Sequence, residues 1–403
     1  MKKICILAIF AVACGIVSAQ TSGTSFSGQN KEKNNYISTG MPILQVAPDA
    51  ISSAMGDAGV ASEPDANSAH WNVAKIVQAE GTGGITTTFT PWLRKLGVTD
   101  MNLFYLAGFY KINQRHAVGM SLTYFTLGDL QCTDWEGNDR GTFKPNEFAL
   151  DASYALMVSD GLSIGASFRY LRSDLTNGMN ISTDGSASGT TTKAANSFAA
   201  DIGIYYNREI DAQNEFAVGG FISNLGAKLS YSDDDTQKEF LPTNLRLGAR
   251  YSYRIDNFNK ISVLFDINKL LVPTPPISDT SKNKYYANRT EYNRTSVMKG
   301  LFQSFYDAPG GFKEEMQELQ LSVGAEYWYS DMFAVRLGYF YENKYKGGRQ
   351  YFSVGAGIRY NVFGFDFSYL IPTTTISNNP LTNTVRIALS VDFGVKHGKR
   401  ESK

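Results

Sequence analysis

Apolar residues alternate with small or polar residues through most of the chain, which is the two-residue period of a β-strand. The pattern is cleanest near the C-terminus, where Ile387, Leu389, Val391 and Phe393 share one face of an extended segment. About fourteen segments repeat it, each of about ten residues, the length that a tilted strand needs to cross a bilayer. They cover roughly 84–90, 102–111, 115–127, 146–158, 161–173, 197–208, 214–225, 245–254, 260–271, 321–329, 333–342, 352–360, 363–371 and 386–393.

Charged residues recur at the centres of these segments, on the face opposite the apolar residues. They are Asp151, Arg169, Asp201, Arg250, Asp266, Glu326 and Arg359. The dry core of a large soluble β-sandwich or propeller could not accept these charges cheaply, whereas a water-filled or plugged lumen can. Aromatic residues also crowd the segment ends, as in the aromatic girdles of membrane barrels. The sequence therefore predicts an all-β fold: a transmembrane antiparallel up-and-down β-barrel of about 14 strands over residues 81–393.

The connections between these segments alternate in length, as in outer-membrane barrels with tight periplasmic turns and large outer loops. Short ones fall near 112–114, 159–161, 209–213, 256–259, 330–332 and 361–363, and long ones near 128–145, 174–196, 226–241 and 272–318. An even number of strands places both ends of the barrel on the periplasmic side. Phe393 supplies the aromatic end of the last strand, and a polar, basic tail, residues 394–403, follows it.

The first nineteen residues are expected to be a signal peptide. Lys2 and Lys3 precede an apolar run, and small residues then offer a cleavage site before Gln20. The alternative is lipoprotein processing before Cys14, but the residues preceding it match such a site poorly. With a signal peptide removed, Cys132 remains alone and no intrachain disulfide can form.

Residues 20–80 precede the barrel and divide into two parts. A polar, Ser-, Gly- and Asn-rich stretch, residues 20–40, is expected to be a flexible leader. Residues 41–80 are compact and are predicted to form a plug inside the lumen, with a small periplasmic cap as the alternative. Glycines allow close backbone approach there, and Asp65 to Ser68 offer helix N-caps. The plug residues singled out are Met55, Gly56, Gly59, Trp71 and Asn72.

The longest interruption of the strand pattern, residues 272–318, is predicted to be an outer loop that contains helix. Prolines near its start cannot extend a ladder. Apolar residues then recur at helical spacing, Asp307 to Gly311 end that helix, and a second helix starts near Phe312. The loop either folds over the barrel mouth or presents a Pro/aromatic surface to a protein partner. The candidate partner-binding residues are Pro273, Pro275, Pro276, Met298, Leu301, Phe302, Phe305 and Tyr306.

Charge and residue chemistry exclude several function classes. Lys+Arg and Asp+Glu both number 38, which disfavours nucleic acid as the main partner. No Gly-rich loop opens a helix after a strand and no His/Cys cluster exists, so no metal, nucleotide or flavin cofactor is expected. His70 is interpreted as a hydrogen-bonded structural residue. A hydrolase would need a nucleophile paired with a histidine, and His116 has no convincing orienting partner, so we expect no enzyme and no catalytic residues.

Eight stretches in order along the chain carry a family resemblance. They are AMGDAGVA (54–61), DANSAHWN (65–72), TPWLRKLGV (90–98), SNLGAKLSY (223–231), LPTNLRLG (241–248), DINKLLVPTPP (266–276), SFYDAPGGFKEE (304–315) and GYFYENKYKGGRQYFSVGAG (338–357). Through them the chain resembles the PorV family, the outer-membrane shuttle barrels of the type IX secretion system, within the FadL-like barrels. The plug stretches are shared with that wider group, which usually has Pro at the position of Val73.

This resemblance implies a fourteen-stranded FadL-like barrel with a non-enzymatic role in protein secretion. The barrel would bind the C-terminal signal domain of cargo leaving the translocon and carry it to the cell-surface attachment complex. Its implied partners are the translocon barrel, a sortase-like surface attachment protease, cargo signal domains, and outer-membrane lipid and lipopolysaccharide. The implied location is the bacterial outer membrane, crossed many times. The alternative function is that of a FadL-like channel for hydrophobic small molecules, which needs a greasy pocket and a path past the plug.

Overall fold

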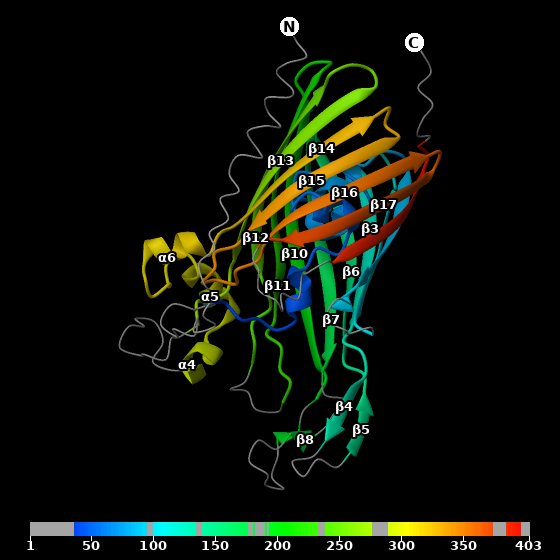
Figure 1. The fold of residues 1–403 in the computed structure, drawn as a ribbon. Helices are drawn as coiled ribbons and strands as arrows, with labels where there is room; N and C mark the ends of the chain where they lie inside the picture. Colours follow the sequence, from blue (N-terminus) through cyan, green and yellow to red (C-terminus); the bar gives the residue numbers. More distant parts are fainter. Residues whose placement is uncertain are drawn as a thin grey trace.

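The computed structural model describes residues 36–94, 100–133, 139–175, 180–181, 190–191, 193–232, 238–275, 289–373 and 384–395. The expected signal peptide, residues 20–35 of the leader, and residues 396–403 of the tail lie outside this part of the chain. Fourteen antiparallel strands form a closed barrel (Figure 1). They are β1 (Gly83–Pro91), β2 (Asn102–Lys111), β3 (His116–Thr126), β6 (Asn146–Ser159), β7 (Leu162–Asp174), β10 (Ala195–Glu209), β11 (Asn214–Gly226), β12 (Asn244–Arg254), β13 (Asn259–Leu270), β14 (Gln320–Tyr329), β15 (Phe333–Tyr341), β16 (Gln350–Tyr360), β17 (Phe363–Pro372) and β18 (Val385–Phe393).

Each barrel strand pairs with its neighbours in chain order, and β1 closes the barrel against β18 with Gly83 opposite Phe393. This is the predicted up-and-down topology, and all fourteen predicted segments coincide with these strands. Two short hairpins extend the long connections, β4 (Leu130–Thr133) with β5 (Asp139–Phe143), and β8 (Asn180–Ile181) with β9 (Thr190–Thr191). These hairpins were not predicted from the sequence, and Cys132, within the predicted long connection 128–145, lies in β4.

The two faces of the wall follow the predicted alternation. In β12, Leu247, Tyr251 and Tyr253 are exposed on the outside, whereas Arg246 and Arg250 are buried inside. The seven charged residues predicted to face the lumen are all buried. Such burial is tolerable because the charges are paired: Arg169 contacts Asp151 and Asp201, and Arg336 contacts Glu326 and Asp366.

The two ends of the barrel differ. We call the end with the short connections, where β1 begins and β18 stops, the turn end; it is at the top of Figure 1. The opposite end, which carries the hairpins and the long connections, is the loop end. This asymmetry is the one predicted from the sequence. Gly161 in one short turn has φ +75° and lies against the Asn207 carbonyl, a place where a Cβ would clash.

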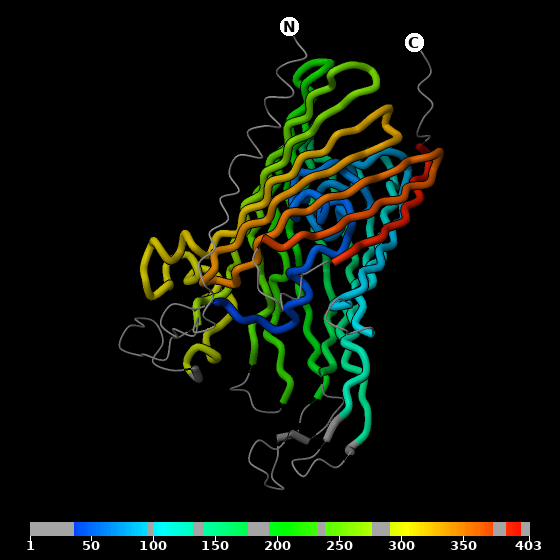
Figure 2. Tube along the Cα trace, in the orientation of Figure 1, coloured from blue at the N-terminus to red at the C-terminus, as the bar shows by residue number. Residues whose placement is uncertain are grey.

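The segment before β1 runs through the inside of the barrel (Figure 2). It contains η1 (Pro42–Gln45), α2 (Ala50–Ser53), α3 (Ser68–Trp71) and η2 (Val73–Gln78), where η denotes a 3-10 helix. We call residues 41–80 the plug. At the loop end, Gly40 N–H donates to the Phe240 carbonyl at 2.9 Å, and Ile37 packs beside Phe240. The plug therefore enters from the loop end and leaves at the turn end. Residues 36–40, expected to belong to a flexible leader, are instead docked there.

Three short helices form a lobe beside the wall at the loop end: α4 (Arg289–Arg294), α5 (Val297–Gln303) and α6 (Phe312–Gln317). The predicted helix from Val297 corresponds to α5 and the second one to α6, whereas α4 was not predicted. Ser296 caps α5 by accepting from Lys299 N–H. None of the helices in the described residues is long and apolar enough to cross a membrane.

Candidate functional site

The plug touches the wall backbone to backbone, and glycines make this approach possible. A Cβ on Gly338 of β15 would lie 2.0 Å from Gly56 N. Gly56 itself has φ +67°, and its own Cβ would lie 2.6 Å from the backbone of Tyr339. Met55 is buried at the same place, where Gly324 of β14 also has no room for a side chain. The structure thus brings the predicted plug residues Met55 and Gly56 against β14 and β15.

Wall side chains accept hydrogen bonds from the plug backbone. Asp266 of β13 accepts from both Gly59 N–H and Val60 N–H through Oδ2, at 2.8 and 2.9 Å. Ser353 of β16 accepts from Gly56 N–H at 2.8 Å. Unpaired buried N–H groups are costly, so these wall side chains replace the partners that a helix or sheet would supply. They anchor the plug at two points of the barrel circumference.

Trp71 and Asn72 hold the second half of the plug. Trp71 Nε1–H donates to Asp49, whose other oxygen accepts from Ser52 N–H at 2.8 Å as the N-cap of α2. Asn72 Nδ2 donates to the carbonyl of Ile204 in β10 at 3.0 Å, while its oxygen accepts from Ala74 N–H to cap η2. Asp49 was missed from the sequence, although an aspartate directly before Ala50 to Ser53 is an N-cap signal.

Lys75 lies fully buried inside the plug. Its Nζ donates to the Gly59 carbonyl and to Ser62 Oγ, both at 2.7 Å. A buried ammonium without such partners would destabilise the fold, so this lysine ties the two halves of the plug together. Val73 begins η2 and is also fully buried.

The half of the lumen nearer the loop end is apolar, and it is filled by residues of the segment that precedes β1. Met41, Ile43 and Leu44 are buried there against wall and loop side chains. The wall contributes Leu103, Phe125, Ala149, Leu171, Ala199, Phe340, Tyr351 and Leu370 to this cluster. Burial of apolar surface contributes about 25 cal/mol per Å², so these contacts favour retention of the N-terminal segment in the lumen.

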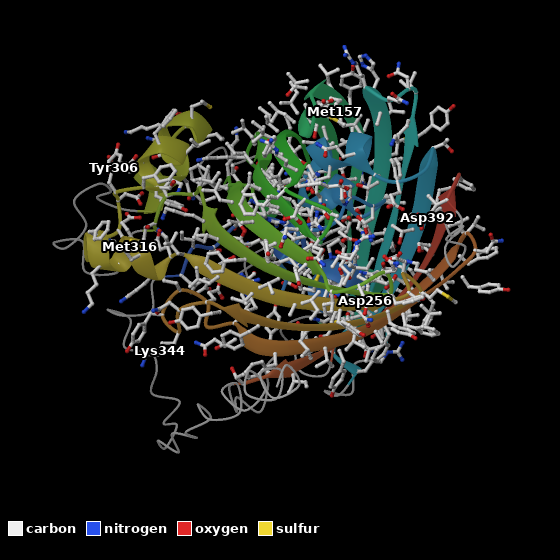
Figure 3. The ribbon with its side chains drawn as sticks, turned by 90° about the horizontal axis from the view of Figure 1, so that it is seen from above. Met157, Asp256, Tyr306, Met316, Lys344 and Asp392 are labelled. Carbon is white, nitrogen blue, oxygen red and sulfur yellow. The ribbon has the colours of Figure 1, made fainter. Side chains whose placement is uncertain are left out.

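The lobe of α4–α6 exposes apolar side chains. Met298 is 56 % exposed, Phe302 62 %, Phe305 47 % and Tyr306 58 %. Figure 3, a view from the turn end, shows Tyr306 and Met316 on the part of the molecule that projects beyond the barrel. We call Met298, Phe302, Phe305 and Tyr306 the outer apolar patch. Exposed clusters of this kind mark interaction sites on soluble and membrane proteins alike.

The remaining predicted partner-binding residues lie elsewhere. Pro273 and Pro275 are buried, and Pro273 packs under Gly300 of α5, so neither can present a surface to a partner. This corrects the predicted Pro/aromatic surface, because both prolines are buried and Pro273 packs against the helix. Leu301 is half-buried, so its exposure is intermediate between that of the buried prolines and that of the outer apolar patch. Pro276 lies outside the described residues.

A buried network of charges fixes the lobe to the wall. Lys269 at the end of β13 pairs with Glu315 and Glu318 at 3.0 and 2.8 Å. Lys346, beyond β15, also pairs with Glu318, at 3.0 Å. Glu318 further accepts from Thr274 Oγ1 at 2.8 Å. We call these residues, together with Asp307, the lobe anchor.

Asp307 is the group of the lobe anchor that titrates near neutral pH. Its Oδ2 accepts from Thr274 N–H at 3.1 Å. Burial and the neighbouring carboxylates of Glu318 and Glu315 raise the pKa of Asp307 to about 7, against the effect of that hydrogen bond. The attachment of the lobe is therefore expected to respond to pH.

The histidines show no catalytic arrangement in the described part of the chain. His70 Nε2 has no hydrogen-bond partner there, and the ring meets Trp71 edge-on with centroids 5.0 Å apart. The ring of His70 packs against Trp71 and Tyr105, and a hydrogen-bonded structural role for this residue stays a prediction. His116 Nδ1 contacts the Tyr154 hydroxyl at 2.6 Å. No group of three or more His, Cys, Asp or Glu side chains in the described residues is arranged to hold a metal ion.

Comparisons with known proteins agree with this architecture. Residues 29–277 match the family described as "Type IX secretion system protein PorV". No curated protein matches the sequence. The solved toluene transporter TodX of P. putida superposes with a TM-score of 0.52 at 10 % identity, covering 86 % of this chain and 99 % of that one. For the Ralstonia pickettii toluene transporter TbuX the values are 0.46 and 14 %, covering 86 % and 98 %, and for a Pseudomonas aeruginosa FadL homologue 0.43 and 11 %, again covering 86 % and 98 %. At these identities, the likeness to TodX shows a shared fold and nothing of its ligand.

Proposed function

Because the chain belongs to the PorV family of type IX secretion system proteins, we propose that it binds the C-terminal signal domain of secreted cargo at the outer membrane. In this proposal the barrel takes cargo from the translocon barrel to the cell-surface attachment complex, where a sortase-like protease acts. The role is non-enzymatic. The turn end faces the periplasm and the loop end faces the cell surface, as in other outer-membrane barrels.

The observation that carries the proposal is the outer apolar patch. Phe302, Phe305 and Tyr306 are exposed on a lobe that a buried charge network holds at the surface end of the barrel, and Tyr306 lies on the part of the molecule that projects beyond the wall. Aromatic and methionine side chains in such a cluster supply the anchor residues of protein interfaces. Lipopolysaccharide and outer-membrane lipid surround the barrel wall below the lobe.

Two substitutions in the patch test the proposal. Phe302→Ser with Phe305→Ser should abolish most binding of a purified cargo signal domain, since truncation of a central anchor residue costs about 2 kcal/mol or more, roughly 30-fold in affinity. The matched control is Lys299→Ser with Lys313→Ser, which changes two exposed lobe residues of polar type. Insertion of both variants is checked by the heat-dependent gel shift of a folded barrel. Normal surface delivery of cargo by the double Phe variant would refute the assignment.

The alternative is a channel for hydrophobic small molecules, and the shared fold with the toluene transporter TodX is its support. Against it stands the filling of the apolar outer lumen by Met41, Ile43 and Leu44. A channel of this kind needs that space for its ligand. Uptake of a labelled fatty acid into liposomes that contain the purified barrel separates the two functions. Uptake would favour the channel, and its absence together with binding of cargo would favour secretion.

A further inference from the structure

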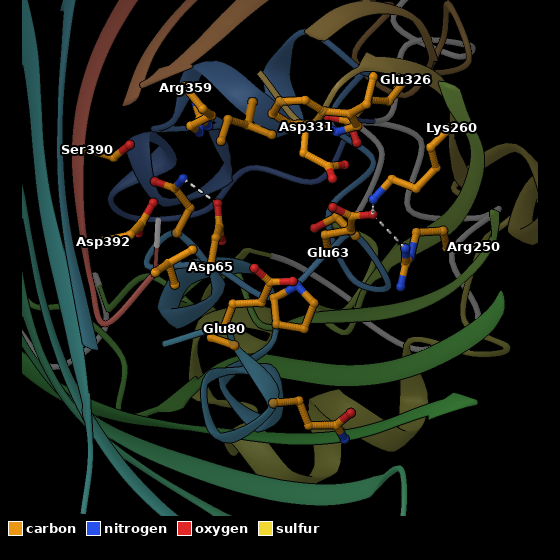
Figure 4. A pocket seen from close by; sticks show the side chains of 18 of the residues that line it. Glu63, Asp65, Glu80, Arg250, Lys260, Glu326, Asp331, Arg359, Ser390 and Asp392 are labelled. Atoms are coloured by element: carbon orange, nitrogen blue, oxygen red, sulfur yellow. Dashed lines mark hydrogen bonds and ion pairs between the residues drawn. The ribbon is translucent and has the colours of Figure 1, made fainter. Parts of the chain in front are cut away.

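A cavity of about 640 Å³ opens at the turn end, between the plug and the short turns (Figure 4). The plug contributes Glu63, Asp65 and Glu80, and the strand ends contribute most of the rest. We call this cavity the vestibule. Since the turn end faces the periplasm in the proposed orientation, the vestibule is open to that compartment and separate from the outer apolar patch.

The charges of the vestibule are unbalanced. Eight acidic side chains line it against five basic ones. Four of the lining cations are already paired: Arg250 with Glu63 and Glu215, Lys260 with Glu63, Arg336 with Glu326 and Asp366, and Arg359 with Asp366. The carboxylates of Glu80 and Glu209, both exposed, line the cavity and have no ion pair among the described residues. The cavity therefore carries excess negative charge, which low-dielectric walls intensify.

Two buried polar side chains lack part of their hydrogen bonding at the vestibule wall. Asn67, 5 % exposed, donates through Nδ2 to Asp65 at 2.7 Å, which leaves its Oδ1 as an acceptor with no partner in the described part of the chain. Arg336, 1 % exposed, likewise has no partner there for Nη2. Buried polar atoms are rarely left unpaired, so these two point to a ligand with both donors and acceptors, as a peptide has.

A segment of matching charge begins at the rim of the vestibule. Val395, the last described residue, lines the cavity next to Asp392. The sequence after it, residues 396–403, holds Lys396, Lys399, Arg400 and Lys403 against one acidic residue, Glu401. Eight residues reach at most about 28 Å, enough to cross the mouth of such a cavity.

We propose that the vestibule is a binding site for a short cationic peptide segment, and that its occupant is the chain's own tail, residues 396–403. The ammonium and guanidinium groups of the tail bind the carboxylates of Asp65, Glu80 and Glu209, and the Asn67 oxygen accepts from one of them. The association is ionic in origin, so it weakens as salt shortens the Debye length. This inference does not depend on cargo binding and concerns the opposite end of the barrel.

Disulfide trapping in isolated outer membranes tests the proposal with the full chain. After Cys132→Ser, cysteines are placed in the tail and in the vestibule, Lys399→Cys with Glu80→Cys. The matched control is Lys399→Cys with Gln114→Cys, in the exposed β2–β3 turn at the same end of the barrel but outside the cavity. We expect the Glu80 pair to cross-link several-fold faster than the control. This advantage should be lost at about 1 M salt, where the Debye length is about 3 Å, and also after Lys396→Gln, Arg400→Gln and Lys403→Gln.

Equal cross-linking of the two pairs, or an advantage that survives both high salt and loss of the tail charges, would overturn the proposal. A mixed disulfide between Glu80→Cys and another protein, in place of the intrachain product, would also overturn it, since the occupant would then be a periplasmic partner. The gel shift of the folded barrel shows whether each variant is inserted. Cargo delivery can be measured in the same membranes, so failure of either proposal is visible independently of the other.

Discussion

The plug and the lobe of α4–α6 are both helical insertions in a strand protein, but they are held in opposite ways. The plug is held by its backbone: Gly56, Gly59 and Val60 donate to wall side chains, and glycines let the two backbones touch. The lobe is held by side-chain charges at its base, with Lys269 and Lys346 between glutamates. The plug buries its apolar residues, whereas the lobe exposes several of them.

This difference indicates different tasks. Backbone contacts without space for a side chain permit only one position, so the plug acts as a fixed part of the barrel. Charge pairs at the base of a lobe restrain its position while leaving its outer face free to bind. A segment that must recognise other proteins is better placed in the second arrangement, because its apolar residues are accessible without any unfolding of the barrel.

The largest effect is expected where the plug touches β15. Gly338→Val places two methyl groups against Gly56 N, where even a Cβ would lie 2.0 Å away. Because the displaced atoms are backbone on both sides, we expect a loss above about 4 kcal/mol or expulsion of the plug. The measurements are the temperature of the heat-dependent gel shift and the ion conductance of the purified barrel in planar bilayers.

A glycine of the outer wall face serves as the control for Gly338→Val. A Cβ on Gly220 would meet only the side-chain tips of Ile204 and Leu247, at 3.3 and 3.5 Å. Gly220→Ala should therefore leave the gel shift and the conductance unchanged. Equal behaviour of the two variants would show that the plug does not depend on backbone contact with the wall.

The next effect concerns the acceptor for the plug backbone. Asp266→Ala leaves the buried N–H groups of Gly59 and Val60 without their acceptor, at a cost of about 1–3 kcal/mol each. Asp266→Asn keeps one acceptor oxygen and should lose less. The thermal unfolding of the purified barrel in detergent ranks the three proteins. If the Ala and Asn variants unfolded at the same temperature, Asp266 would stabilise the barrel through its charge and not through these hydrogen bonds.

The strands of the wall could be predicted from the sequence, because the alternation of apolar and polar residues is visible within each short segment. The polarity of each side chain indicates whether it faces the lumen or the outside. Arg250 between Ala249 and Tyr251 shows directly which side is the lumen. The plug was predicted as a unit, and its glycines were found, but not their partners. The contact of Gly56 with Gly338 joins residues far apart in the chain, and no local pattern encodes it.

The lobe was predicted less completely for the same reason. Helical spacing predicted a helix with Met298 and Phe302 on it, and both are exposed on α5, yet the spacing could not show that Pro273 packs against Gly300 of that helix. The charge pairs of Lys269 were also invisible, since its partners are 46 and 49 residues later. Burial of a residue in a long connection depends on what the connection folds against.

A smaller and more local effect is expected at the base of the lobe. Lys269→Met keeps the length of the side chain but removes both ion pairs, to Glu315 and Glu318. Glu318 retains Lys346, so the loss is about 1.5–3 kcal/mol, the value of a hydrogen bond between charged groups. Limited proteolysis of the lobe should accelerate while the barrel gel shift stays unchanged. A lowered gel-shift temperature would mean that the lobe anchor also stabilises the barrel, so the lobe would not be an independent attachment to the wall.

The smallest effect is a change with pH at Asp307. Its pKa is about 7 in the attached lobe and returns toward its ordinary value of 3.8 when the lobe detaches. Between these values the attached lobe holds a proton that the detached lobe has released, so attachment weakens as pH rises from about 4 to about 7 and stays constant above.

Asp307→Asn tests this dependence, because the amide keeps an acceptor for Thr274 N–H and cannot ionise. The ratio of lobe proteolysis in the two proteins, taken at each pH, cancels the pH dependence of the protease. We expect the natural protein to be cleaved relatively faster as pH rises from 5 to 8, roughly the window set by these pKa values. A ratio that does not change with pH would show that Asp307 does not titrate between pH 5 and 8. The lobe would then be a fixed structure like the plug, differing from it only in what it exposes.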